Sequence, residues 1–216
     1  MIKVCGMRDA QNIREVEALG IDWMGFIFWK PSKRYCAQKP EYLPENCKRV
    51  GVFVNAEIDE IVDKCKEYRL DLIQLHGKED RAYVIQLRRA LAEAEIGNIP
   101  LFIKAFAMQS QDDLKKCDQY VGFVDYFLFD TPTPGYGGSG KNFDWSLLET
   151  YTLFTPFLLS GGIGPDSADL VNAFNNPFCA GIDLNSKFES APGFKDVEKL
   201  KAFIPQVRKT EQYSYN

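Results

Sequence analysis

Cys5 is the first residue in this sequence whose type and position suggest chemistry. It closes the apolar run Ile2–Cys5 and precedes Gly6, which allows the chain to turn sharply. A free thiol titrates near ~8.5, so a modest downward shift of its pKa makes it a competent base near neutral pH. A buried small apolar side chain is the usual fate of a free cysteine. Position alone leaves both interpretations of Cys5 open.

Asp130 closes a second apolar run, Tyr126–Asp130. A carboxyl group at such a point can serve as a general acid, and a carboxylate that caps a helix or braces a loop explains the position equally well. The glycine-rich segment 135–141 follows, but its glycines and lysine lack the spacing of a nucleotide-binding loop. We interpret this segment as a loop that closes over a ligand.

Two turns have the composition of a phosphate-binding site. The first, 160–165, contains Gly161, Gly162 and Ile163 and opens a predicted helix. The second runs from Asp183 through Asn185 to Ser186 and follows another apolar run. Backbone N–H groups in glycine turns and at helix starts hold phosphate without side-chain charge. Ordinary helix-start chemistry is the alternative explanation.

One arginine and one histidine lie close to predicted strand ends. Arg34 lies in the loop 31–46, where a guanidinium can form two parallel hydrogen bonds with a substrate carboxylate. Position alone favours a solvated loop arginine. His76 is the only histidine in the chain and closes the run 72–76. We assign it no acid–base role, because a lone histidine is more often structural.

Short apolar runs that alternate with helical stretches must position these residues. The runs are rich in Val, Ile, Leu and Phe, which suits parallel strands buried on both faces. The predicted strands are 2–5, 23–28, 49–53, 72–76, 101–106, 126–130, 157–160 and 181–184. The predicted helices are 10–19 (with Asp9 as N-cap), 58–68, 81–94, 114–121, 145–151, 167–174 and 197–204. The segment 31–46 is expected to be a long loop with a short helix.

This pattern predicts an α/β protein, a single-domain (β/α)8 TIM barrel over residues 1–208, with a polar C-terminal tail at 209–216. An open doubly wound sheet has the same local pattern. The unusual residues follow predicted strands one, two, four, six, seven and eight. A barrel builds its active site from many such loops, whereas a doubly wound sheet uses one crevice, so their spread favours the barrel.

Composition restricts the partners of this chain. Its 216 residues include 26 Lys plus Arg against 30 Asp plus Glu, and the net charge of -4 argues against nucleic acid or an anionic membrane. No apolar run is long enough to span a bilayer, and no secretory signal is evident. The six cysteines are scattered without metal-ligand spacing, which predicts reduced thiols, a cytoplasmic protein and no metal. Monomer and homodimer both remain open.

Taken together, these segments resemble the phosphoribosylanthranilate isomerases of tryptophan biosynthesis. The similar segments follow the family's order along nearly the whole chain: Lys3-Val4-Cys5-Gly6-Met7, Gly25-Phe26-Ile27-Phe28, Ser32-Lys33-Arg34-Tyr35, Gln74-Leu75-His76-Gly77, Phe129-Asp130, 137–145, Ser160-Gly161-Gly162-Ile163, Gly181-Ile182-Asp183, and Glu189 with Pro192-Gly193-Phe194-Lys195-Asp196. The resemblance implies an Amadori rearrangement of N-(5-phosphoribosyl)anthranilate to 1-(2-carboxyphenylamino)-1-deoxyribulose 5-phosphate, the third step of tryptophan synthesis from chorismate. It implies no metal and no other cofactor.

The resemblance also implies roles for the candidate residues. Asp130 protonates the furanose ring oxygen, and the Cys5 thiolate removes the C2 proton of the resulting Schiff base. Arg34 binds the anthranilate carboxylate, with Asp183 nearby on the other side. The phosphate-binding residues are Gly161, Gly162, Ile163, Asn185 and Ser186.

One departure from the family lies in the phosphate loop. Where the family has Ser-Ser-Gly, this chain has Asn185-Ser186-Lys187, and the missing glycine removes easy access to positive φ. We therefore expect a loop of different shape, with Lys187 pointing to solvent.

Two other functions compete with this interpretation. The histidine-pathway isomerase performs the same rearrangement on another phosphoribosyl amine, but its members use two aspartates and resemble half-barrel repeats. Here the first strand ends in Cys5, and the halves of the chain show no evident repeat. A barrel that binds phosphate without catalysis needs neither Cys5 nor Asp130.

Overall fold

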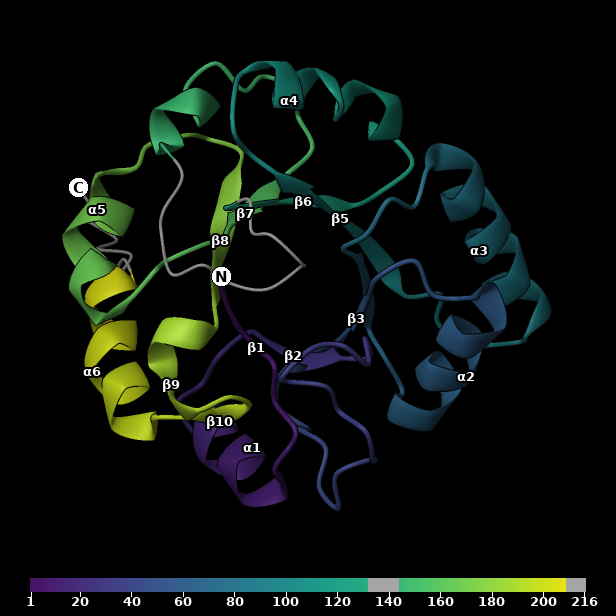
Figure 1. Ribbon diagram of the computed structural model, residues 1–216, viewed down its shortest axis with the longest axis horizontal. Helices are drawn as coiled ribbons and strands as arrows, with labels where there is room; N and C mark the ends of the chain where they lie inside the picture. Colours follow the sequence, from purple (N-terminus) through teal and green to yellow (C-terminus); the bar gives the residue numbers. More distant parts are fainter. Residues whose placement is uncertain (132–143, 209–216) are drawn as a thin grey trace, which may run out of the picture.

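The computed structural model describes residues 1–131 and 144–208, whose strands close into a barrel (Figure 1). The strands are β1 (Ile2–Cys5), β2 (Trp23–Ile27), β3 (Lys48–Phe53), β4 (Leu72–Leu75), β5 (Leu101–Ala107), β6 (Tyr126–Asp130), β7 (Phe157–Leu159) and β8 (Cys179–Leu184). Each strand pairs in parallel with the next, and β8 pairs with β1 through Ile2–Ile182 and Val4–Leu184. This last pairing confirms the predicted barrel and excludes the open doubly wound sheet.

Helices surround the barrel on its outer face (Figure 1). They are α1 (Ala10–Glu17), α2 (Ile58–Tyr68), α3 (Arg81–Glu93), α4 (Asp112–Lys115), α5 (Ala168–Ala173) and α6 (Val197–Val207). Short 3-10 turns are η1 (Asp118–Tyr120), η2 (Trp145–Leu148), η3 (Pro165–Ser167) and η4 (Ser186–Phe188). The helices α1, α3 and α6 each begin after an aspartate that accepts a hydrogen bond from the third N–H along the chain, and Asp9 is the predicted N-cap of α1.

Alternation of side chains along the strands produces two apolar layers. The layer inside the barrel contains Trp23, Val50, Val52, Leu72, Ile103, Leu128 and Leu158. The layer between the barrel and the helices contains Phe26, Phe53, Phe102, Phe127, Phe157 and many smaller residues. Near the carboxyl ends of the strands, polar side chains replace apolar ones on the inner face, so the inner layer stops below the barrel mouth and leaves room for a ligand.

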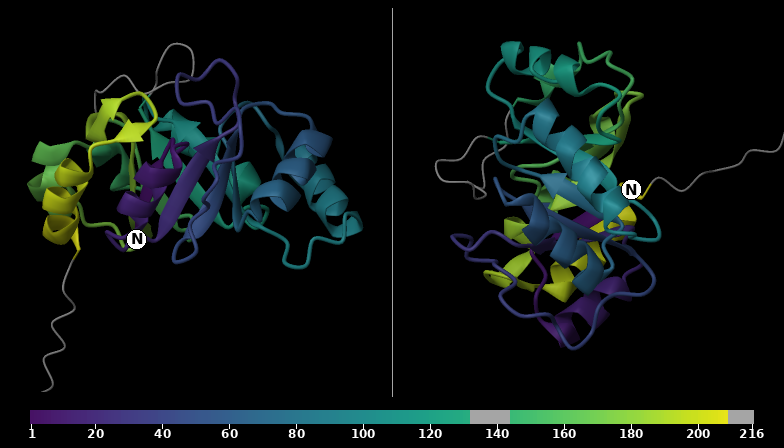
Figure 2. Two further views of the ribbon diagram at one scale, coloured as in Figure 1. Left: turned by 90° about the horizontal axis from the view of Figure 1, so that it is seen from below. Right: turned by 90° about the vertical axis from the view of Figure 1, so that its right-hand side faces the viewer.

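A hairpin that the sequence analysis did not predict follows β8. It consists of β9 (Glu189–Ala191) and β10 (Phe194–Lys195), which pair antiparallel. Gly193 in the turn adopts a φ of +80°, which glycine reaches without strain. Figure 2 shows this hairpin beside the barrel mouth, at the carboxyl ends of the strands.

The outer layer is less regular than predicted. The expected short helix within 31–46 is wrong, because this segment contains turns, bends and one isolated bridge from Tyr35 to Ile27 but no helix. Its prolines remove N–H donors, and the Glu17 carboxylate accepts hydrogen bonds from the amides of Glu45 and Asn46. The predicted helix 114–121 divides into α4 and η1, and 145–151 contains only η2.

Two predictions fall outside the described residues, namely the loop 135–141 and the tail 209–216. The described elements of the barrel and its hairpin run from Ile2 to Val207. No helix in the described part of the chain is long and apolar enough to cross a bilayer.

Candidate active site

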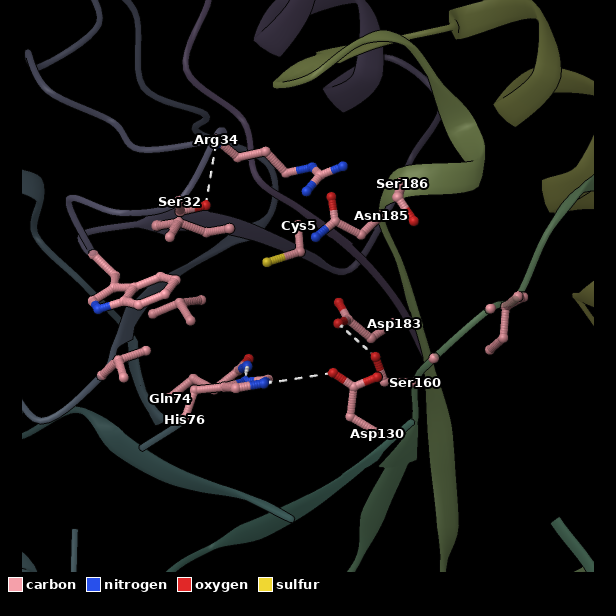
Figure 3. A pocket seen from close by; sticks show the side chains of 17 residues that line it. Cys5, Ser32, Arg34, Gln74, His76, Asp130, Ser160, Asp183, Asn185 and Ser186 are labelled. Atoms are coloured by element: carbon pink, nitrogen blue, oxygen red, sulfur yellow. Dashed lines mark hydrogen bonds and ion pairs between the residues drawn. The ribbon is translucent and has the colours of Figure 1, made fainter. Parts of the chain in front are cut away.

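A cavity opens at the carboxyl ends of the strands and brings all the candidate site residues together (Figure 3). It encloses about 760 Å³, counting its open mouth. The sequence-predicted residues that line it are Cys5, Arg34, Asp130, Gly161, Gly162, Ile163, Asp183, Asn185 and Ser186. Barrel topology explains this convergence, since the loops that follow parallel strands meet at one end of the barrel.

Cys5 points into the cavity from the end of β1 and is 3% exposed. Its Sγ atom lies against Gly25 of β2, where a Cβ atom would approach the sulfur to 2.7 Å. A side chain at position 25 would therefore displace the thiol. Burial raises the pKa of the Cys5 thiol above its ordinary value, and the positive charge of Lys3 opposes that rise.

Lys3 forms a buried ion pair one layer deeper in the barrel. Its Nζ atom donates to Asp183 Oδ1 at 2.8 Å, and Asp183 Oδ2 accepts from the Ser160 hydroxyl at 3.2 Å. Burial lowers the pKa of Lys3, but Asp183 and Cys5 outweigh it and hold the pKa above its usual value. Lys3 is thus a cation that can balance a thiolate at Cys5. Sequence analysis missed Lys3, although strand alternation places it on the same face as Cys5.

Asp130 enters the cavity from the opposite wall and has two neighbours that orient it. Its Oδ1 accepts a hydrogen bond from the Thr131 amide at 2.8 Å, and its Oδ2 lies 3.5 Å from His76 Nε2. Gln74 Nε2 lies 2.8 Å from His76 Nδ1. Because an amide nitrogen only donates, Nδ1 is the acceptor and the proton of a neutral imidazole is on Nε2, facing Asp130. The His76 N–H thus lies on the side of Asp130, at a distance longer than an ordinary hydrogen bond.

The two turns predicted to bind phosphate, 160–165 and 183–186, lie side by side at the rim. Gly161 and Gly162 adopt φ values of +81° and +71°, which favour glycine. A Cβ atom on Gly161 would lie 2.8 Å from Asp130 Oδ1, so this turn packs directly against the carboxyl group. A Cβ atom on Gly164 would lie 3.4 Å from the Cβ of Lys187, which places the second turn beside the first.

The segment 185–187, for which the sequence predicts a loop of different shape, lies at the start of η4, with Asn185 preceding the turn. Lys187 is exposed, as predicted, and adopts no left-handed conformation. Asn185 and Ser186, which precede Lys187, still line the cavity.

Arg34 reaches the cavity from the loop after β2, and the solvated alternative for it is wrong. Its Nε and Nη2 atoms donate to the two Glu189 carboxylate oxygens at 2.7 and 2.6 Å, and its side chain is only 14% exposed. Glu189 also accepts from Lys195 Nζ at 2.7 Å. Sequence analysis assigned neither Glu189 nor Lys195 to the site. The hairpin brings both residues to Arg34.

The fold and the site together define a class: a (β/α)8 barrel whose thiol and carboxyl group face one cavity beside the turns 161–163 and 185–186. Within residues 1–131 and 144–208, no group of His, Cys, Asp and Glu is arranged to hold a metal ion. All six cysteines are free thiols.

Comparison with known proteins identifies the family. The family model described as N-(5'phosphoribosyl)anthranilate (PRA) isomerase matches residues 2–206. The N-(5'-phosphoribosyl)anthranilate isomerase of Parabacteroides distasonis is 50% identical over 96% of this chain and 93% of its own length. The crystal structure of phosphoribosyl anthranilate isomerase from Thermotoga maritima is 36% identical, with a TM-score of 0.77 over 95% of this chain and 97% of that chain. The chain therefore belongs to the phosphoribosylanthranilate isomerase family.

A further crystal structure of a phosphoribosyl anthranilate isomerase is similar and contains a ligand. It is 32% identical, with a TM-score of 0.75 over 95% of this chain and 97% of that chain. That protein is in complex with reduced 1-(o-carboxyphenylamino)-1-deoxyribulose 5-phosphate.

Proposed function

We propose that this chain isomerises N-(5-phosphoribosyl)anthranilate with Asp130 as the general acid and Cys5 as the general base. The reaction follows from the family to which the chain belongs. The observation that supports the two roles is geometric: the thiol and the carboxyl group face one cavity from β1 and β6 (Figure 3). One acid and one base across a cavity suffice for an Amadori rearrangement.

The proposed reaction moves protons and needs no oxidant. Asp130 donates a proton to the furanose ring oxygen as the C1–O bond breaks, and the amine nitrogen supplies the electron pair of the Schiff base. The Cys5 thiolate then removes the C2 proton, which leaves an enolamine. Tautomerisation of the enolamine adds a proton to C1 while the C2 hydroxyl gives up its own, which produces the C2 ketone. Transfer of one proton from the Cys5 thiol to the Asp130 carboxylate through solvent returns both groups to their starting forms. Substrate and product are isomers, so atoms and electrons balance.

Three parts of the cavity match three parts of the substrate. The turn 161–163, with Asn185 and Ser186, suits the phosphate, because backbone N–H groups bind it without side-chain charge. The guanidinium of Arg34 suits the carboxylate. An apolar wall suits the aromatic ring and consists of Ile27, Trp29, Val52 and Val54.

The environment of Cys5 predicts a pH profile. Because burial raises the pKa of this thiol, the free protein holds it protonated at neutral pH. Iodoacetamide reacts with the thiolate form of a cysteine, so inactivation of the protein by this reagent is expected to accelerate with pH over the range from about 7 to about 9. Loss of activity at a fixed reagent concentration measures this rate. An inactivation rate that is already constant below neutral pH contradicts a buried, protonated thiol at Cys5.

A fluorescence assay that follows loss of phosphoribosylanthranilate tests the function. The purified chain is expected to turn over this substrate at a rate that a chelator leaves unchanged, since the acid–base pair needs no metal. The phosphoribosyl amine of the histidine-pathway isomerase serves as the control substrate. Turnover of only that control, or a rate that requires added metal, overturns the proposal. Growth rescue of a tryptophan auxotroph that lacks this step provides an independent readout.

A further inference from the structure

A buried cluster of three charged side chains stands at the edge of the cavity: Arg34, Glu189 and Lys195. Glu189 begins β9 and Lys195 ends β10, so the hairpin supplies two of the three charges. The side chains of Glu189 and Lys195 are 5% and 0% exposed. Charges buried to this degree have lost their water, and they persist only where the partners hold a fixed geometry.

The contact between Arg34 and Glu189 uses one specific side of the guanidinium. Nε and Nη2 donate in parallel to the two oxygens of Glu189 at 2.7 and 2.6 Å. A guanidinium has five N–H donors, and this pairing occupies the fork formed by Nε and Nη2. The second fork, formed by Nη1 and Nη2, is left for another carboxylate. No hydrogen bond from Nη1 occurs among the described residues.

Lys195 connects the Glu189 carboxylate to Asn185, in the turn 185–186. Its Nζ atom donates to Glu189 Oε1 at 2.7 Å and to Asn185 Oδ1 at 2.8 Å. Glu189 Oε1 also accepts from the Gly193 amide at 3.1 Å, which ties the turn of the hairpin to the cluster. Glu189 therefore links Arg34, through Lys195, to Asn185 on the same edge of the cavity.

Steric contacts fix the position of this cluster relative to the Cys5 thiol. A Cβ atom on Gly6 would lie 2.8 Å from Arg34 Cδ and 3.0 Å from Asn185 Oδ1. Gly6 directly follows Cys5, so Arg34 and Asn185 both pack on the turn that carries the base. Figure 3 shows Arg34 extending over Cys5 toward Asn185 and Ser186.

The charges of the cluster explain why the linking residue is an acid. Burial opposes the negative charge of Glu189, but hydrogen bonds from Arg34 and the charge of Lys195 outweigh it and hold the pKa of Glu189 below its usual value. Glu189 is thus an anion between Arg34 and Lys195. Burial lowers the pKa of Lys195, and the charge of Glu189 opposes that fall. Without Glu189, Arg34 and Lys195 would repel each other across the cavity edge.

We propose that Glu189 is a positioning residue. It orients Arg34 so that the Nη1 and Nη2 donors point at the substrate carboxylate, and through Lys195 it fixes the distance between Arg34 and the turn 185–186. The inference rests on the proposed function, which gives Arg34 and Asn185 their ligands. Glu189 itself does not touch the substrate. Its effect is on binding of the carboxylated end, because the rest of the cavity is formed by other elements.

Glu189→Gln tests this role with two ligands. One probe is the reduced product 1-(o-carboxyphenylamino)-1-deoxyribulose 5-phosphate, and the other is its phenyl counterpart without the carboxyl group. The amide keeps the shape of Glu189 but opposes a donor to a donor of Arg34, so only one hydrogen bond of the fork survives. Calorimetric titration is expected to show that the variant loses affinity for the carboxylated probe by about 10-fold or more. Affinity for the phenyl probe is expected to change little.

Matched variants separate positioning from general damage. Glu198→Gln makes the same substitution at an exposed glutamate whose nearest cation, Lys201, is 3.9 Å away, and it is expected to bind both probes like the parent. Glu189→Asp keeps the charge but is too short to reach both partners, and it is expected to show the same selective loss even where Glu189→Gln does not fold. Thermal unfolding monitors the fold of each variant.

The outcomes distinguish this inference from the proposed function. Equal losses of affinity for the two probes indicate a structural role for Glu189. An unchanged preference for the carboxylated probe in the folded variants shows that Glu189 does not position Arg34. Either result overturns the inference. A parent protein that does not distinguish the two probes refutes the carboxylate role of Arg34 instead.

Discussion

Replacement of Cys5 by serine is expected to lower kcat by about 10³-fold or more while the fold persists, because general base catalysis contributes on this scale. Serine places a hydroxyl against Gly25, where the thiol now lies, and adds no atom to a tightly packed layer. The hydroxyl is a far weaker acid than a thiol, so even beside Lys3 it supplies no base for the C2 proton. Binding of product does not require the base and is expected to remain.

Two measurements test the Cys5→Ser variant. Steady-state kinetics supplies kcat, and titration with the reduced product supplies affinity. Cys47→Ser is the matched control, since Cys47 is a half-buried thiol outside the candidate site and its replacement is expected to leave kcat unchanged. Near-normal turnover in Cys5→Ser would show that another group removes the C2 proton.

Positions along a strand could be predicted because they are local properties of the chain. Cys5 and Asp130 each end an apolar run, and the structure ends β1 and β6 at these same residues. The period of two along a strand also determines which side chains face inward. Applied to β1, it would have found Lys3, a lysine on the same face as Cys5 within an apolar strand.

The partners of these residues depend on contacts that no local pattern contains. The separation in sequence between Arg34 and Glu189 is 155 residues, and the two meet only because the barrel closes. The hairpin that carries Glu189 has a local signal, the Pro192-Gly193 turn, but two strands this short have no apolar period of their own. The proximity of His76 and Asp130 requires β4 and β6 to lie on either side of β5 in the barrel. Such contacts follow from the closed topology.

Asp130→Asn is expected to lower kcat by about 10²–10⁴-fold, the range of general acid catalysis. The asparagine side chain has the size of the carboxyl group. Its oxygen can still accept the hydrogen bond that the Thr131 backbone N–H donates to Asp130 at 2.8 Å in the parent protein. It has no acidic proton to give to the furanose ring oxygen, so opening of the ring becomes slow. Gly161 packs on this side chain and keeps the amide in the same place.

Comparison with His76→Asn decides which of the two neighbouring groups is the acid. His76 Nε2 faces Asp130 at 3.5 Å and orients it, so loss of the imidazole is expected to reduce kcat less than loss of the Asp130 proton does. Asp169→Asn, at an exposed position of α5, is the control for the substitution itself. If His76→Asn proves the more damaging change, the proton comes from the imidazole, and Asp130 has the positioning role. If neither variant slows the reaction, ring opening needs no acid from this wall, and the chemistry rests on the Cys5 side of the cavity alone.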